Sequence, residues 1–351
     1  LFITSKNVHN HDALKDAECE FGIVTQQIVS ENAAILHMRP STLSNILKKT
    51  NEKLGGANIA ITSPDLPQWM LSESTMIIGM TIENPRPQTR DDIEKKLFHD
   101  RPSIISWSIN AVKGRPDEHT QFTGGYVYAL PVESKLTPSQ SETKRHTMIR
   151  IVESFMDCKG IMPEHVLLIR RVNEGDSKVI FDEIAQLMSV FSSMGISKLV
   201  VVTASVTHSN RLFDPNMDRR ARPADQNLES GAILDTKITS PTKNEFFLQA
   251  HVPRQGTARP TKFELLYADD EKSISMDDIE AAMFSLCHAH AVCDMTTALP
   301  TPLKVSEEYA KRALNLFNYK QRETRGWEQE RLNKELAIQP KSTLDMIRTN
   351  A

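Results

Sequence analysis

Pairs of cationic side chains at helical spacing are the first feature of this sequence that could bind a ligand. In "TLSNILKKTNEKLGGAN", Lys49 and Lys53 are four residues apart and share one face of a helix that ends at Gly55-Gly56. Two neighbouring ammonium groups repel each other, and a multiply charged anion between them removes that repulsion. The alternative is a solvated lysine face at a helix C-terminus, where the helix dipole stabilises cations.

Three residues upstream have the types that would complete such an anion site. His11 and Lys15 in "HDALK" form a second pair four residues apart, and Gln26 lies in "GIVTQQ". A histidine can stack on a nucleobase or bind a phosphate, and a glutamine amide can donate N–H to phosphate oxygens. Each of these residues alone is more often an ordinary surface residue. Together with the two lysines, they have the residue types needed to bind a 5′-terminal nucleotide.

The length and composition are those of an ordinary globular protein. The 351 residues allow one large domain or two smaller ones, with 39% hydrophobic and 25% charged residues. The formal charge of −3 gives no overall sign of nucleic-acid binding, but a phosphate pocket needs only a local cluster of cations. The four cysteines lack zinc-ligand spacing, and we expect reduced thiols in an intracellular protein. No apolar run approaches the roughly 20 residues that span a bilayer, so no membrane partner is expected.

Strand-like and helical segments alternate along the chain, and these elements must position the cations. Helices are expected over about 12–21, 40–53, 141–158, 176–193, 276–292 and 305–318. Strands are expected at "LFIT", at residues 76–82, at "HVLLIRRV" and at "KLVVVTASV", with "SIISWSINAV" and "GGYVYALPV" as an antiparallel pair. This order predicts a mixed α/β fold with an antiparallel portion.

Many of these segments resemble the Argonaute family. "STLSNILKKTNEKLGGAN" is similar to the signature that closes the family's MID domain, and "GIVTQQI" to the segment with the phosphate-pocket glutamine. "LIRRVNEG", "NRLF", "DTKITSPT", "QAHVPRQGTARPTKF", "LCHAHAVC" and "LPTPL" resemble PIWI-domain segments in the family's order and spacing. The resemblance covers about residues 1–319. The pattern "EYAKRA" is most like the divergent nematode-type members that lack slicer residues.

The resemblance implies an α/β fold in which part of a Rossmann-like MID domain precedes an RNase H-like PIWI domain, with a mixed sheet and flanking helices. The expected boundaries are 1–68 for the C-terminal part of MID, 69–325 for PIWI and 326–351 for a charged C-terminal tail. That tail reads as a helix with a solvated face or as a loose segment. Because the chain opens directly on "LFITS", we expect a C-terminal fragment of a protein that also has N-terminal and PAZ domains.

The resemblance also implies a binding site for the 5′ phosphate of a guide RNA. Its residues would be Lys53, Lys49, Gln26 and Lys15, with His11 where a tyrosine usually stacks on the first base. The spacing from Lys15 to "GIVTQ" is one residue shorter than in the family, so Leu14 competes for that place. The guide carries a 5′ phosphate or triphosphate, and Mg²⁺ is allowed beside it.

Further along the guide, three residues match positions that contact its backbone. His251 and Arg259 in "AHVPRQGTARP" match residues that hold the seed, and Arg211 in "NRLF" matches another family arginine. An arginine fork suits phosphate oxygens, and a surface salt bridge is the alternative for an isolated arginine. The family's late phosphate-contacting arginine falls near Leu316, which implies that this contact is lost.

The nuclease site of the family looks degenerate in this chain. Cleavage needs two metal ions about 4 Å apart, held by carboxylates and usually a histidine. The first aspartate position holds Thr81, the second holds Arg170, and the final ligand position holds Lys311, across a four-residue insertion after "LPTPL". The fourth, a glutamate, falls near Ser134. No slicer metal is therefore expected, and Arg170 and Lys311 would be placed to neutralise target phosphates instead.

The combined interpretation is small-RNA-guided gene silencing without target cleavage. The chain would bind the 5′ end and seed of a guide RNA, pair it with a complementary target RNA and recruit silencing effector proteins. The expected location is intracellular, in the cytoplasm, in perinuclear RNA granules or in the nucleus. Two alternatives stay open. One is an active endoribonuclease that uses unorthodox carboxylates (Glu83, Glu133 and Glu174), and the other is a protein scaffold without a guide.

Overall fold

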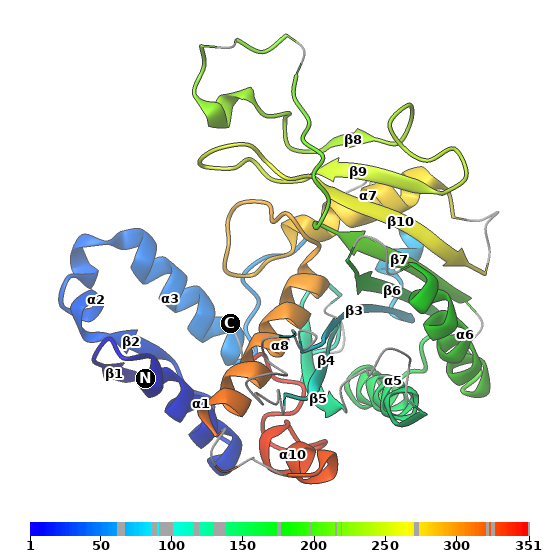
Figure 1. The fold of residues 1–351 in the computed structure, drawn as a ribbon. Helices are drawn as coiled ribbons and strands as arrows, with labels where there is room; N and C mark the ends of the chain where they lie inside the picture. Colours follow the sequence, from blue (N-terminus) through cyan, green and yellow to red (C-terminus); the bar gives the residue numbers. More distant parts are fainter. Residues whose placement is uncertain are drawn as a thin grey trace.

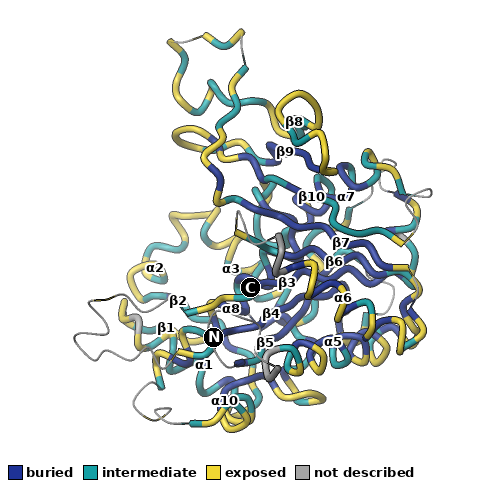
Figure 2. The backbone as a smooth tube through the Cα atoms, turned by 45° about the vertical axis from the view of Figure 1, so that its right-hand side comes forward, coloured by how far each residue is buried: buried dark blue, intermediate teal, exposed yellow. Residues whose placement is uncertain are grey.

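The chain folds into a small N-terminal unit beside a large mixed sheet (Figure 1). This computed structural model describes residues 1–61, 67–85, 90, 101–115, 119–129, 138–173, 177–196, 198–214, 216–218, 220–269, 274–320, 323 and 327–349. Figure 2 shows the strands of the large sheet as buried, whereas much of the N-terminal unit is half-buried or exposed.

The N-terminal unit carries most of the predicted anion-binding residues. It contains β1 (Phe2–Thr4), α1 (Val8–Phe21), β2 (Gln27–Val29), α2 (Ser30–Ala34), η1 (Leu36–Met38) and α3 (Pro40–Lys53), and β1 pairs with β2 in parallel. Helix α1 begins earlier than the sequence predicts, because the Asn7 side chain accepts a hydrogen bond from the His9 N–H (3.0 Å) and caps the first turn. Helix α3 begins at Pro40, whose fixed φ suits the first turn, and ends at Lys53 as predicted.

The large sheet has eight strands in the order β5-β4-β3-β6-β7-β10-β9-β8. Their bounds are β3 (Thr75–Glu83), β4 (Ser103–Ile109), β5 (Thr123–Ala129), β6 (His165–Arg171), β7 (Lys198–Ser205), β8 (Ala232–Leu234), β9 (Glu245–Gln249) and β10 (Thr261–Ala268). The central strands β3, β6 and β7 are parallel, and the flanking pairs are antiparallel. The mixed sheet and the predicted antiparallel pair β4-β5 are therefore confirmed.

Helices cover both faces of this sheet. On one face lie α7 (Met276–His288) and α8 (Thr301–Tyr319), and on the other lie α5 (Pro138–Lys159) and α6 (Ser177–Ser193). Short 3₁₀ turns, η2 (Gln68–Leu71) and η3 (Pro223–Gln226), lie in the connections. Helix α8 crosses the middle of the sheet closely, because Gly79 of β3 has no side chain to keep the backbone of Pro302 away. Helix α8 also faces the N-terminal unit, so it can carry residues for two sites.

The C-terminal segment differs from the predicted charged tail. Helix α10 (Gln329–Leu336) packs against the sheet, with Leu332 and Leu336 buried. The Asn333 amide exchanges two hydrogen bonds with the backbone of Tyr128 (2.7 and 2.8 Å). Of the two forms predicted for this segment, the helix with a solvated face is borne out and the loose segment is not, because an apolar side of the helix packs into the core. The predicted division at residues 68 and 325 stays a prediction.

Candidate nucleic-acid site

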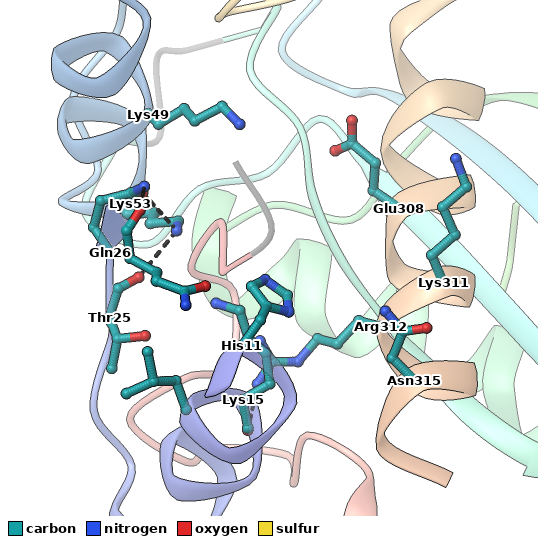
Figure 3. A pocket seen from close by; sticks show the side chains of 12 residues that line it. His11, Lys15, Thr25, Gln26, Lys49, Lys53, Glu308, Lys311, Arg312 and Asn315 are labelled. Carbon is teal, nitrogen blue, oxygen red and sulfur yellow. Dashed lines mark hydrogen bonds between the residues drawn. The ribbon is translucent and has the colours of Figure 1, made fainter. Parts of the chain in front are cut away.

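A cavity of about 310 Å³ lies between the N-terminal unit and α8. It is lined by α1, the approach to β2, α3 and α8 (Figure 3). The residues around it are His11, Leu14, Lys15, Thr25, Gln26, Gln27, Lys49, Lys53, Glu308, Lys311, Arg312 and Asn315. All five residues predicted for the 5′ phosphate therefore line one cavity, and we refer to it as the cationic pocket.

Lys53 is the most constrained lysine of the cationic pocket. Its side chain is 6% exposed, and its ammonium group donates hydrogen bonds to the Thr25 carbonyl (3.0 Å) and to Gln26 Oε1 (2.9 Å). Burial and the nearby charge of Lys15 lower the pKa of Lys53 to about 7. An anion beside this lysine would raise its pKa again and favour the charged form.

Gln26 and Lys49 differ in how free they are to meet a ligand. The Gln26 amide is occupied at both ends, since its oxygen accepts from Lys53 and its nitrogen donates to the Gln27 carbonyl (3.0 Å). Lys49 is half-buried and extends from α3 across the hollow toward α8 (Figure 3). Lys49 thus presents a charge to the cavity, whereas Gln26 positions Lys53.

Beneath the cavity lies a buried ion-pair cluster of Lys15, Glu18 and Arg312. The Glu18 carboxylate is fully buried and accepts from Lys15 Nζ (2.8 Å) and Arg312 Nη1 (2.5 Å). It also accepts from the backbone N–H and hydroxyl of Thr25 (2.8 and 2.7 Å). Burial favours protonation of Glu18, but Arg312 and Lys15 outweigh it and hold its pKa below the ordinary value. Glu18 balances one of these two charges, so the cluster shapes the pocket floor and leaves it with a net charge of +1.

Arg312 lines the cationic pocket but was not among the residues predicted from the sequence. The sequence alignment placed the family's late arginine at Leu316, but Leu316 is fully buried in the core. One turn earlier, Arg312 lines the cationic pocket, and Lys311 lines it beside Arg312. If the four-residue insertion after "LPTPL" is removed, the arginine position moves from Leu316 to Arg312. With that spacing the late arginine would fall on Arg312 instead of being lost, and this assignment stays a prediction.

His11 and Leu14 occupy the α1 side of the pocket. The His11 ring is about half exposed, with Nδ1 3.4 Å from the Asp12 carboxylate. Leu14 and Lys15, the two candidates for one place in the 5′ phosphate site, both line the cavity. Leu14 supplies an apolar contact, while the Lys15 ammonium group turns to Glu18.

The C-terminal segment reinforces the far wall of the pocket. Arg348 is buried, and its guanidinium bonds Glu308 of α8 (2.6 Å) and Glu52 of α3 (3.2 Å). Burial alone would raise the pKa of Glu308, but Arg348 and His290 hold it at about 2. Glu308 on the pocket wall is thus paired with Arg348, and Arg348 joins α8 to α3.

Thr81, predicted at the first metal-ligand position, is buried. Thr81 is 1% exposed, and its hydroxyl bonds the hydroxyl of Ser306 on α8 (2.7 Å). Neither group carries a charge, and each already has the other as a partner. Thr81 therefore contacts α8 as a structural residue, at the position where the resemblance places the family's first aspartate.

Arg170, predicted at the second position, does not share the face of Thr81, whereas Arg171 does. Side chains on a strand alternate between faces, and Ile169 belongs to the core on the α8 face, so Arg170 points to the opposite face. There Arg170 Nε lies 3.3 Å from Glu183 Oε1, and Lys144 Nζ lies 3.1 Å from Glu183 Oε2. Arg171 faces α8 instead, where it forms an ion pair with Glu307. The one-residue shorter loop after β6 caused this error in register.

Lys311, predicted at the third position, lies in the cationic pocket, and Glu307 lies next to the Ser306 that bonds Thr81. Removing the same four-residue insertion moves the final ligand position to Glu307, which follows Ser306 and pairs with Arg171. Lys304 Nζ lies 3.7 Å from the same carboxylate. Lys311 lies one helical turn further on and belongs to the cationic pocket. Arg170 and Lys311 are therefore not placed to neutralise target phosphates together.

These residues do not fit a pair of metal ions. Two dications need at least two free carboxylates, but the site offers a buried hydroxyl, a guanidinium and one carboxylate already paired with cations. Among the described residues, no three His, Cys, Asp or Glu side chains gather as a metal site. Glu83 is exposed at the end of β3. Glu133, Ser134 and Glu174 lie outside the described residues.

The three predicted backbone-contacting residues lie outside the cationic pocket. Arg211 follows β7, and His251 and Arg259 flank the loop between β9 and β10. The Arg259 guanidinium donates to the Val206 carbonyl (3.1 Å), which brings that loop next to the segment after β7. Burial lowers the pKa of His251, so its ring favours the neutral form. Within the described part of the chain, no helix is both long and apolar enough to cross a bilayer.

Comparisons with known proteins agree with this architecture. Argonaute protein wago-1 of Caenorhabditis elegans is 29% identical, covering 98% of this chain and 36% of that protein. Argonaute protein wago-4 of the same organism is 32% identical over 79% of this chain and 29% of its own length. The chain thus spans about a third of the length of the curated relatives it matches.

Solved structures share the fold at low identity. The C-terminal lobe of a budding yeast Argonaute superposes with a TM-score of 0.80 and 17% identity, covering 99% of this chain and 67% of that one. Kluyveromyces polysporus Argonaute with a guide RNA gives a TM-score of 0.81 at 17% identity, covering 99% of this chain and 41% of that one. The predicted RNase H-like fold is therefore confirmed. Since the model of the Piwi domain matches residues 1–318, the chain belongs to the Argonaute family and contains its Piwi domain.

Proposed function

We propose that the cationic pocket holds the 5′ phosphate of a small guide RNA and that the protein acts in small-RNA-guided silencing. The convergence of Lys49, Lys53 and Lys311 on one cavity carries this proposal. These three lysines come from two helices, α3 and α8, that face each other across the hollow (Figure 3). No single helix face explains this arrangement, so the alternative of a solvated lysine face at the end of α3 loses its support.

Each side of the pocket would have a different task. Lys49, Lys53 and Lys311 would contact the phosphate, with Gln26 holding Lys53 in place. Lys15 and Arg312 would hold the floor through Glu18, and the exposed His11 ring would stack on the first base. Arg211, His251 and Arg259 would follow the guide backbone beyond it. Mg²⁺ beside the 5′ phosphate belongs to the proposal as well, and binding with and without a chelator would test it.

The second part of the proposal is that the target RNA is bound without being cleaved. Thr81, Arg171 and the paired Glu307 cannot collect two dications, so silencing would depend on effector proteins recruited to the target. Guided cleavage of a labelled complementary RNA, measured with Mg²⁺ and with Mn²⁺, is expected to show no product. A product with sharp ends opposite the guide would favour the endoribonuclease that uses other carboxylates.

Lys53→Ala is expected to weaken binding of 5′-phosphorylated RNA by about 10- to 100-fold. This is the change in affinity expected when one hydrogen bond to a charged group is lost. Affinities for the same RNA with a 5′ phosphate and with a 5′ hydroxyl would be measured at fixed salt, because phosphate binding depends on salt. Lys6→Ala is the matched control, since Lys6 is exposed and does not line the pocket. Equal weak binding of both RNAs by the unchanged protein would favour the guide-free scaffold.

The affinity for the 5′ phosphate is expected to fall as the pH rises above about 7. The pKa of Lys53 is about 7 in the empty pocket, and a bound phosphate raises it. Below pH 7 the lysine is charged before and after binding, so it adds no pH dependence. Above pH 7 binding must take up a proton, which lowers the affinity by up to about tenfold per pH unit. Titrations at pH 7, 8 and 9 should show this slope, and Lys53→Ala should remove it.

A further inference from the structure

The place of the missing metal ions holds a small cationic cluster that the guide site does not use. It consists of Arg171 at the end of β6 and Lys304 and Glu307 on α8, and we refer to it as the α8 cluster. Arg171 and Lys304 both direct their charges at the Glu307 carboxylate. Two cations and one anion leave this cluster with a net charge of +1.

We propose that Arg171 and Lys304 bind a backbone phosphate of the target RNA, at the position where an active relative would hold the metal ions. The inference rests on the proposed function, because it assumes that a guide and target pair reaches the sheet. It differs from the site first expected from the sequence, in which Arg170 and Lys311 were to do this.

Exposure separates the cations that can reach a ligand from those that cannot. The side chains of Arg171 and Lys304 are 28% and 36% exposed, whereas Glu307 between them is 9% exposed. Arg170 is buried on the opposite face of the sheet and shares Glu183 with Lys144. Therefore Arg171 and Lys304 can meet a strand from solvent without leaving their carboxylate.

The contacts that Lys304 and Arg171 already make leave both side chains able to bind a further anion. At 3.7 Å, the Lys304–Glu307 contact is longer than a normal hydrogen bond, so a phosphate oxygen can compete for the ammonium group. Burial and the charge of Lys311 lower the pKa of Lys304, and a nearby anion would reverse this effect. The planar guanidinium of Arg171 has more donors than one carboxylate can accept. Both cations therefore have capacity left for a phosphodiester.

Such a cluster would hold a strand and leave it intact. The metal ions of a two-metal nuclease neutralise the phosphate and also activate the attacking water. A guanidinium and an ammonium group supply the neutralisation alone, and the hydroxyls of Thr81 and Ser306 are bonded to each other. The replacement thus keeps the electrostatic attraction for the target and removes the hydrolysis.

The test measures binding of a guide–target duplex to Arg171→Gln, to Lys304→Gln and to the double variant at several salt concentrations. Each single variant is expected to bind the duplex about tenfold more weakly, as for one charge-assisted contact. The slope of log affinity against log salt should fall by about 1 for each cation removed. Lys320→Gln is the matched control, because Lys320 is an ion-paired lysine just after α8 that lies outside both sites.

Two further arms keep the result unambiguous. If Arg171→Gln alone does not fold, Arg171→Gln with Glu307→Gln takes its place, because this double variant leaves no unpaired buried charge. It should bind the duplex about tenfold more weakly, as expected for the single variant. Single-stranded guide with a 5′ phosphate should bind every variant as it binds the unchanged protein. Unchanged duplex affinity and salt slope in the double cation variant would overturn the inference. A wild-type protein that ignores the 5′ phosphate would instead overturn the proposed function, and the duplex arm would still report on the α8 cluster.

Discussion

Arg312→Ala is expected to lower the free energy of unfolding by about 3–5 kcal/mol, the usual cost of breaking a buried ion pair. Its side chain is 3% exposed, and removing it leaves the fully buried Glu18 carboxylate with Lys15 and Thr25 as partners. The contact also joins α1 to α8, so the cationic pocket should widen and lose affinity for 5′-phosphorylated RNA. Urea unfolding followed by fluorescence, with the same RNA titration, would measure both effects.

Two companion variants identify the cause of the Arg312 effect. Arg312→Lys keeps the charge but loses the second guanidinium contact, to the Lys15 carbonyl (3.3 Å). Its free energy of unfolding should lie between those of the unchanged protein and Arg312→Ala. Arg312→Met with Glu18→Gln and Lys15→Met removes all three buried charges and should recover part of the stability. A loss below about 1 kcal/mol for Arg312→Ala, as for an exposed ion pair, would contradict the buried cluster.

Gly79→Ala is expected to cost about 3 kcal/mol, the upper end of the range for overpacking a core. An added Cβ would lie 2.2 Å from the carbonyl carbon of Pro302 and 2.7 Å from the Leu303 nitrogen. Both are backbone atoms in the first turn of α8, so the helix itself must move. Because the same helix carries Lys311 and Arg312, binding of 5′-phosphorylated RNA should fall together with stability.

Gly195→Ala is the control for that prediction. A Cβ at Gly195 would meet nothing within 4 Å, but its φ of 82° makes alanine unfavourable by about 1–2 kcal/mol. RNA binding should be unaffected there, since Gly195 follows α6 on the other face of the sheet. If Gly79→Ala were as mild as Gly195→Ala, the close approach of α8 to β3 would be wrong.

The sequence predicted the elements whose signals are local. Helix α3 begins at a proline and ends before two glycines, and its predicted bounds agree with the structure. The buried parallel strands β6 and β7 read as nearly continuous apolar runs, which is typical of strands covered on both faces. Lys49 and Lys53, which line the cationic pocket, were predicted together because helical spacing and the family resemblance agreed there.

The errors arose where a side chain's position depends on register. A slip of one residue at the end of a strand moves a side chain to the other face of the sheet, which is the difference between Arg170 and Arg171. A slip of four residues in a helix keeps the face but moves the residue one turn along the axis, which is the difference between Glu307 and Lys311. Composition cannot reveal either slip, because arginine follows arginine and charged residues recur along α8.

The buried side of the C-terminal helix was not predicted, for a related reason. Helix α10 is polar in composition, but its few apolar residues lie on one side and cover the aromatic residues of β5. Burial of Arg348 could not be read from the sequence, because its two carboxylate partners come from α3 and α8. Such contacts become visible only when distant segments are placed together.

The bond between Arg312 and Glu18 joins residues 294 positions apart, and this separation governs when the pocket can exist during synthesis. At typical translation rates, α1 leaves the ribosome about 15–60 s before α8 does. Throughout that interval Glu18 lacks its main partner, and the exposed Phe21 and Leu54 of the N-terminal unit remain open to chaperones. The cationic pocket therefore cannot form on a nascent chain before α8 emerges, and under the proposed function loading with a guide would follow that step.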